Sequence, residues 1–169
     1  MERDNEFPNL MAVLQEYGAA LRNLYQDKLI LADKIATGEL LNNVNYEVTV
    51  EGTVYKVSLD LLPYWKYIEG GIKPAGEYEN PGWKALPPIR QWITAKPVLP
   101  RPQDGRLPSP DTLAFLITRK IVNEGIEPHP FYAESVEEVN AHYKPLIIEA
   151  FRKDTYTTLR DIAFRGLGL

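Results

Sequence analysis

The sequence has no cysteine and only two histidines among its 169 residues. Without cysteine, the chain has no disulfide framework, no thiolate metal site and no thiol nucleophile. It has no run of about 20 apolar residues, so we expect no membrane span. The first six residues, MERDNE, are charged and do not resemble a signal peptide. What remains is a globular composition, with 44% apolar and 25% charged residues.

The chain also lacks an excess of positive charge. Its 19 lysines and arginines are outnumbered by 23 aspartates and glutamates, which gives a net charge of −4. Proteins that bind nucleic acid by neutralising phosphates usually carry a clear basic excess. We therefore expect no specific binding of DNA and no strong general binding.

Sequence motifs of catalysis are missing as well. There is no HExxH, no GxSxG and no glycine-rich phosphate loop followed by Lys-Ser or Lys-Thr. His129 lies between two prolines and His142 lies on a predicted helix, so surface roles suit both histidines. The acidic pair Glu137 and Glu138 fits a solvated face better than a glycosidase site. We predict no enzyme activity, no catalytic residue, no metal and no cofactor.

A long helix is predicted over residues 8–36. Pro8 suits its first turn and Gly38 its end. Apolar residues recur at alternating spacings of four and three, which is the spacing of a narrow apolar stripe. The stripe indicates either a helix that faces the core of its own chain or one that packs partly on another subunit.

The periodicity changes to two over residues 45–60. Apolar and polar residues alternate on both sides of Glu51-Gly52, a pattern typical of a β-hairpin. Because two strands alone are only marginally stable in water, the hairpin must lie on a helix, join other strands or pair with a neighbouring chain.

Proline and tyrosine are unusually abundant in the chain, with 14 and ten residues. Nine of the prolines fall in residues 74–110, where a short helix at 88–95 is predicted and the rest must be an extended loop. Loops of this length in compact domains tend to be functional or disordered.

Two further helical segments follow the loop. The first, residues 111–124, begins with Asp111 as a cap and ends at Gly125. The second, residues 134–164, begins with a capping box that Ser135 would form with a glutamate three residues on. Pro145 should kink or break this segment, so that two helices meet there in a kinked helical arm. The predicted fold is a single α+β domain over residues 1–169: a long N-terminal helix, a β-hairpin, C-terminal helices packed on it and an extended proline-rich loop.

Rigid aromatic rings and loop apolar residues are good contact surface. The rings near the hairpin and loop suggest either a platform that stacks on carbohydrate or bases, or a small core that clamps the prolines. We predict that the interface of this protein includes Tyr55, Tyr64, Trp65, Tyr67, Trp83, Trp92, Val98, Leu99 and Leu107.

Three segments together resemble a known family. They are residues 65–74 (WKYIEGGIKP), 87–93 (PPIRQWI) and 113–131 (LAFLITRKIVNEGIEPHPF). Their order and spacing are similar to those of small phage proteins that complete the tail or join head to tail, also called minor tail components. The long proline-rich stretch is similar to versions from crAss-like phages of Bacteroidetes, whose tails contain stacked rings.

The resemblance implies a structural virion protein that forms or completes a ring around the DNA channel. Its partners would be copies of itself and portal, neck or tail proteins, and genomic DNA would pass without specific binding. It would be assembled in the host cytoplasm and located in the neck or tail of the virion. The alternative from the residues is a small non-catalytic module that recognises peptide or carbohydrate through its aromatic rings.

Overall fold

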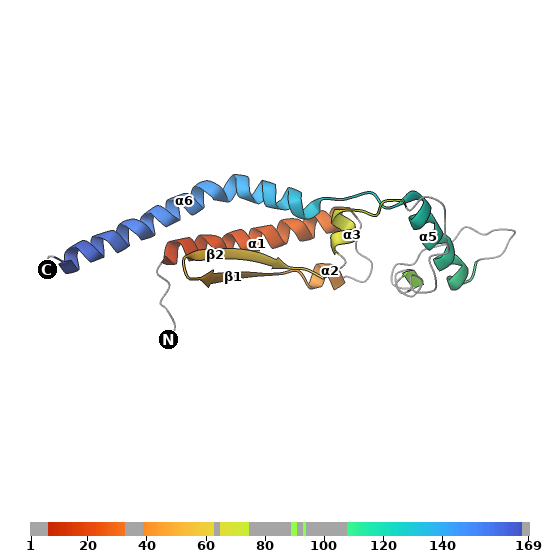
Figure 1. Ribbon diagram of the computed structural model, residues 1–169, viewed down its shortest axis with the longest axis horizontal. Helices are drawn as coiled ribbons and strands as arrows, with labels where there is room; N and C mark the ends of the chain where they lie inside the picture. Colours follow the sequence, from red (N-terminus) through yellow and green to blue (C-terminus); the bar gives the residue numbers. More distant parts are fainter. Residues whose placement is uncertain are drawn as a thin grey trace. The chain divides into compact units, whose positions relative to one another are not determined.

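A computed structural model describes residues 7–32, 39–62, 65–74, 89–90, 93 and 108–166. The chain divides into two compact units (Figure 1). The first unit contains residues 1–29, 44–61 and 131–169, and the second contains residues 30–43 and 62–130. Whether the two units unfold together is a matter for experiment, so the single domain expected from the sequence stays a prediction.

The first unit is built on helix α1 (Pro8–Leu31), the hairpin and helix α6 (Phe131–Gly166). Figure 1 shows α1 between α6 on one side and the hairpin on the other. Helix α1 therefore needs apolar residues along its whole length, as the periodicity of the sequence predicted. Its buried residues recur at spacings of three and four: Leu10, Leu14, Gly18, Leu21, Tyr25 and Leu29.

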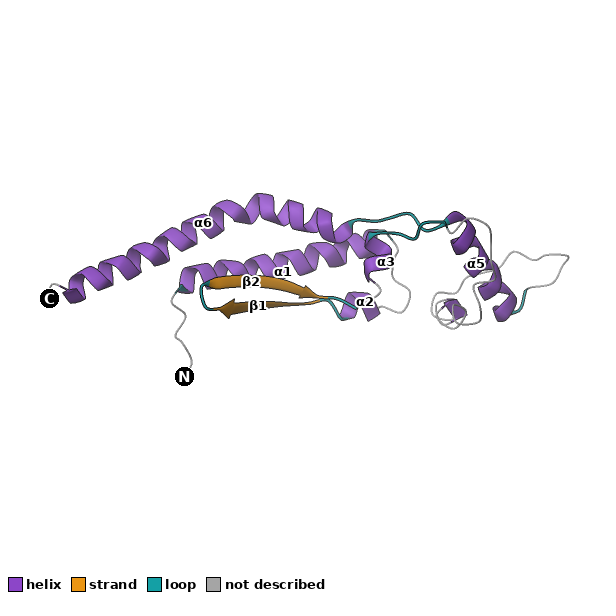
Figure 2. Cartoon of the chain, in the orientation of Figure 1, coloured by secondary structure: helices purple, strands orange, loops and turns teal. Residues whose placement is uncertain are grey.

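The hairpin forms as predicted, from β1 (Asn45–Glu51) and β2 (Val54–Asp60) (Figure 2). The antiparallel register pairs Val48 with Val57 and Tyr46 with Leu59, so these half-buried residues share one face. The ring of Tyr46 lies so close to Gly18 of α1 that any side chain at Gly18 would overlap it. Of the three expected ways to support the hairpin, packing on a helix is therefore the one seen.

Helix α6 runs antiparallel to α1. Near its start, Glu134 contacts Lys28 at the end of α1, and farther along, Asp154 contacts Asn9 at the beginning of α1. Between these points, the ring of Tyr143 meets the ring of Tyr17 edge to face at 5.7 Å. Residues 155–166 therefore continue past the N-terminal end of α1.

Two predictions for α6 were wrong. The helix begins at Phe131 rather than after a cap at Ser135, which is instead fully buried inside the helix. Pro145 also does not divide the segment, because the helix is continuous through it. Because proline has no N–H group, Pro145 cannot donate to the carbonyl of Ala141 four residues earlier. Both residues are exposed, so water can bond to that carbonyl, and the helix bends without breaking (Figure 1).

The second unit contains the helices α2 (Glu39–Asn42), α3 (Trp65–Glu69) and α5 (Pro110–Glu124). The Ser109 hydroxyl, rather than the predicted Asp111, caps α5 by accepting a bond of 3.1 Å from the amide of Thr112. Asp111 instead lies in the first turn and forms an ion pair of 2.8 Å with Arg90. Gly125 ends α5, as predicted. Most of the proline-rich segment 74–110, including most of its predicted helix, lies outside the described residues.

No helix in the described part of the chain is long and apolar enough to span a bilayer.

Candidate interaction surface on α6

Asp154 fastens α6 to the beginning of α1. One carboxylate oxygen accepts hydrogen bonds from the amide and the side chain of Asn9, at 3.2 and 2.6 Å, and the other accepts from the amide of Leu10 at 2.8 Å. The first amides of a helix lack partners within it, and Phe7, which precedes α1, has no side-chain acceptor. Asp154 therefore provides from a distant helix the cap that the local sequence lacks.

Phe7 extends this junction with apolar contacts. Its ring stacks on Phe151 of α6 at 5.5 Å and meets Tyr55 of β2 edge to face at 6.0 Å. One ring thus joins the hairpin and α6 at the point where α6 leaves α1. Tyr55, predicted as an interface residue, is half-buried and takes part in this internal contact.

From Ile148 onward, through the junction and past it, α6 exposes large apolar side chains. The exposed fractions are 44% for Ile148, 49% for Phe151, 61% for Leu159 and 62% for Ile162. With the half-buried Thr155 between them, these residues follow one another at spacings of three and four, so they lie on one face of the helix. We call these five residues the outer stripe.

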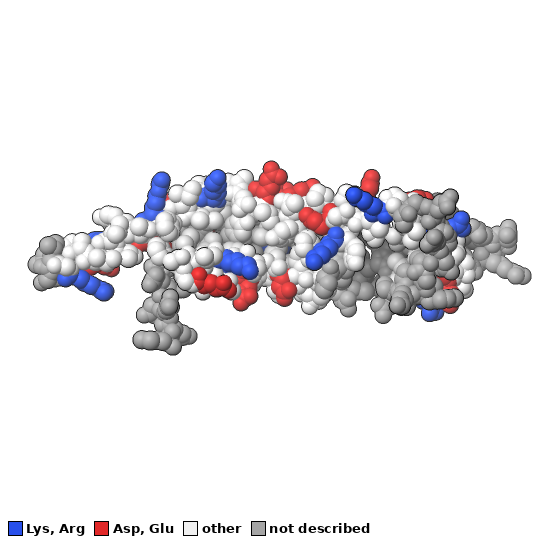
Figure 3. All heavy atoms as spheres, viewed as in Figure 1, with Lys and Arg blue, Asp and Glu red and all other residues white. Residues whose placement is uncertain are grey.

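The outer stripe and the buried residues occupy different faces of α6. Ala150 and Asp154 are buried, whereas the stripe residues between and beyond them are largely exposed. In Figure 3, where white marks every uncharged residue, the described part of the C-terminal end of α6 is mainly white, with some basic and acidic side chains among it. Contiguous exposed apolar surface of this kind marks a site of protein–protein or membrane interaction.

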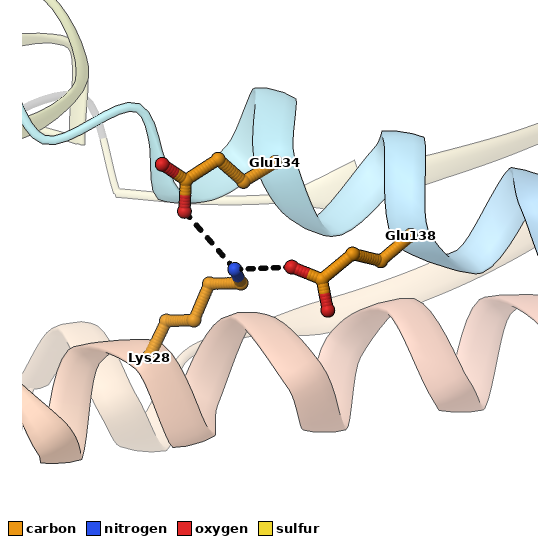
Figure 4. A network of polar contacts seen from close by, with 3 residues as sticks. All are labelled: Lys28, Glu134 and Glu138. Atoms are coloured by element: carbon orange, nitrogen blue, oxygen red, sulfur yellow. Dashed lines mark hydrogen bonds and ion pairs between the residues drawn. The ribbon is translucent and has the colours of Figure 1, made fainter.

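A polar contact holds the other end of the α1–α6 pair. The ammonium group of Lys28 lies 3.0 Å from a carboxylate oxygen of Glu134 and 2.5 Å from one of Glu138 (Figure 4). The hydrogen bonds to Glu138 and then Glu134 raise the pKa of Lys28 above its usual 10.5. The glutamate predicted to face solvent at position 138 thus helps to align two helices.

In the second unit, two glycines allow two extended segments to cross. Ile72 and Ile126 exchange backbone hydrogen bonds of 3.0 and 2.8 Å. Gly71 and Gly125, which precede them, both have positive φ and lie against the opposite backbone with no room for a side chain. Two of the segments that carry the family resemblance, 65–74 and 113–131, therefore meet here.

The remaining predicted interface residues are only partly placed. Trp65 is half-buried in α3, and Tyr67 on the same helix is 61% exposed. Whether these rings form one cluster stays a prediction, because the others lie outside the described residues: Tyr64, Trp83, Trp92, Val98, Leu99 and Leu107.

The two histidines lie on different segments, His129 before α6 and His142 within it. His129 is half-buried and its amide donates to the carbonyl of Ile68 at 2.8 Å, and His142 is exposed beside Tyr143. Among the described residues, no group of three or more histidines and carboxylates could hold a metal ion.

The outer stripe was missed by the sequence analysis. Its residues were read as part of a packed helix, because apolar spacing alone does not tell a face turned to the core from a face turned outward. Comparison of the chain with models of protein families, with curated proteins and with solved structures found no match.

Proposed function

We propose that the protein is a non-enzymatic structural subunit of a phage virion, which forms or completes a ring at the head–tail junction around the DNA channel. The observation that carries the proposal is the exposed outer stripe on a helix firmly anchored to its own chain. Apolar surface held outward in this way suits a protein whose work is to bind other proteins. The family resemblance of residues 65–74, 87–93 and 113–131 supplies the virion setting.

The first unit offers two docking elements for such a ring. One is the outer stripe, and the other is the hairpin, a two-stranded sheet whose outer strand edges pair with no third strand among the described residues. Closed rings use head-to-tail contacts between unlike surfaces, and a helix face and a strand edge are unlike surfaces. The net charge of −4 favours passage of DNA over its retention.

The test is assembly of the full chain with its neighbours. The protein would be co-expressed with the portal and tail proteins encoded beside it, and complexes would be isolated and viewed by electron microscopy. The expected result is ring-shaped particles that contain this chain. A chain that never joins those proteins, and forms no ring at any concentration, would refute the proposal.

The second candidate is a binding module for peptide or carbohydrate. The observation that favours it is Tyr67, which is largely exposed beside the half-buried Trp65 on α3. Titration with proline-rich peptides and oligosaccharides, followed by tryptophan fluorescence, separates the two functions. A saturable change that Tyr67→Ala abolishes would favour the module.

A further inference from the structure

The outer stripe is symmetric about Thr155. Phe151 and Leu159 lie four residues to either side of it, and Ile148 and Ile162 lie seven residues to either side. The residues at matching distances are all large and apolar, and the central one is small. If the helix is turned end for end about Thr155, the pattern of large and small residues on this face stays the same.

Such a face is complementary to itself. If two copies of α6 cross antiparallel at Thr155, then Phe151 of each copy meets Leu159 of the other, and Ile148 meets Ile162. The small threonine at the centre lets the two helices approach closely. We propose that the outer stripe binds the outer stripe of a second copy, antiparallel, with the twofold axis at Thr155.

The charges of this helix are compatible with the pairing. Glu149 is bonded to Lys153 at 2.8 Å, and Arg160 to Asp161 at 3.2 Å, so these charges are paired within each copy. The exposed Arg152, next to the stripe, would face Thr158 of the other copy, so the antiparallel arrangement sets no like charge against it. The apolar stripe, rather than attraction between charges, holds the pair.

The exposed area indicates how strong the pairing is. A large aromatic or aliphatic side chain that is about half exposed offers roughly 100 Å², so the four large residues of the stripe provide about 400 Å² per copy. Stable complexes bury about 800 Å² per partner. Tyr156, which lies beside Leu159 at the edge of the stripe and is exposed, adds to this area. The pair is therefore a weak dimer that assembly can take apart.

This contact differs from the one a ring needs. An antiparallel pair joins identical surfaces and closes after two copies, whereas a cyclic ring joins unlike surfaces. The inference therefore goes beyond the proposed function: it concerns free subunits, whose stripes pair before they dock in a ring.

Because the chain has no cysteine, single cysteines can report the arrangement. Thr155→Cys is expected to form a disulfide-linked dimer under mild oxidation, since two copies of this position meet at the axis. Leu159→Cys alone should form no disulfide link, because its two copies lie far apart in the pair, but it should link to Phe151→Cys when the two variants are mixed. Thr157→Cys, on the opposite face of the helix, is the matched control and should not link. Self-linking of Leu159→Cys would mean parallel pairing and would overturn the proposal.

Sedimentation of the cysteine-free chain gives the independent measurement. Leu159→Glu is expected to raise the dissociation constant of the dimer about a hundredfold, and Thr157→Glu, an equal change of charge on the opposite face, to leave it unchanged. Equal dimerisation of both variants, or a chain that is monomeric at every concentration, would overturn the pairing. Neither result bears on whether the chain joins portal and tail proteins, which the co-expression experiment decides separately.

Discussion

Replacing Asp154 with alanine should destabilise the first unit more than the change of any exposed charge. The side chain is only 3% exposed and accepts three hydrogen bonds from the beginning of α1. It is also a negative charge placed at the positive end of a helix dipole. The alanine variant would leave the amide of Leu10, which is buried, without a partner.

The magnitude follows from the two parts of this loss. Removing a helix cap costs about 1–2 kcal/mol, and leaving a buried amide unsatisfied costs about 1–3 kcal/mol. We expect Asp154→Ala to lower the free energy of unfolding by about 3 kcal/mol. Asp154→Asn keeps one oxygen that can accept from Leu10, but it places an NH2 group, which cannot accept, where the other oxygen accepts from Asn9. It should therefore cost about 2 kcal/mol.

The assay is urea unfolding followed by two signals. All three tryptophans, Trp65, Trp83 and Trp92, belong to the second unit, so their fluorescence reports that unit. Far-ultraviolet circular dichroism is dominated by helices, of which the longest, α1 and α6, belong to the first unit. If the variant shifts only the dichroism transition, the units unfold separately. If both transitions move together, the single domain predicted from the sequence is confirmed.

The matched control is Asp161→Ala on the same helix. Asp161 is half exposed and bonded to its neighbour Arg160, so its loss should change the stability by less than about 0.5 kcal/mol. A loss below about 0.5 kcal/mol for Asp154→Ala, or an equal loss for both variants, would refute the role assigned to Asp154.

Three further changes test other contacts. Lys28→Met should lower the free energy of unfolding by about 1 kcal/mol at pH 7. Bonding to Glu138 and Glu134 raises the pKa of Lys28 in the folded chain, so the stabilisation should be complete below pH 10.5 and disappear as the pH rises through the raised pKa. Urea unfolding across that pH range would measure this loss. Ser135→Ala should leave stability unchanged or raise it by up to about 1 kcal/mol in thermal unfolding, because the buried hydroxyl of Ser135 has no hydrogen-bond partner within the described part of the chain; a clear loss would contradict this. Gly71→Ala should destabilise the second unit by about 2 kcal/mol, because the new methyl group would overlap the facing backbone and because alanine disfavours the positive φ of this position. The loss should appear in the unfolding transition followed by tryptophan fluorescence. An unchanged midpoint would show that the two segments can move apart to make room.

The elements that local sequence determines were predicted well. The hairpin follows from alternation around Glu51-Gly52, and the end of α5 follows from Gly125, because both depend on residues adjacent in the chain. The cap of α1 could not be predicted, since Asp154 lies 145 residues from Asn9 and only the packing of α6 brings them together. The continuity of α6 through Pro145 also depends on packing and on solvent around the freed carbonyl.

The candidate surface was harder to predict than the fold, for a related reason. The residues of the outer stripe have the spacing of any amphipathic helix, and the sequence does not state which side of a helix another element will cover. In α6 the buried face is selected by the contacts at both ends of α1, namely Lys28 with its two glutamates and Asp154 with the first amides. Once those contacts fix the rotation of the helix about its axis, the outer stripe faces away from α1.

This dependence links the stability of the chain to its assembly. Asp154 and the outer stripe lie on one continuous helix, so the bonds that hold Asp154 also determine the direction in which Phe151 and Leu159 face. A variant that frees this end of α6, such as Asp154→Ala, lets the helix rotate and cover its own stripe. We therefore expect this variant to weaken dimerisation as well as folding, although Asp154 touches no residue of the proposed interface partner. A dimer whose dissociation constant is unchanged in Asp154→Ala, under conditions where the chain stays folded, would show that the stripe is presented without help from this anchor.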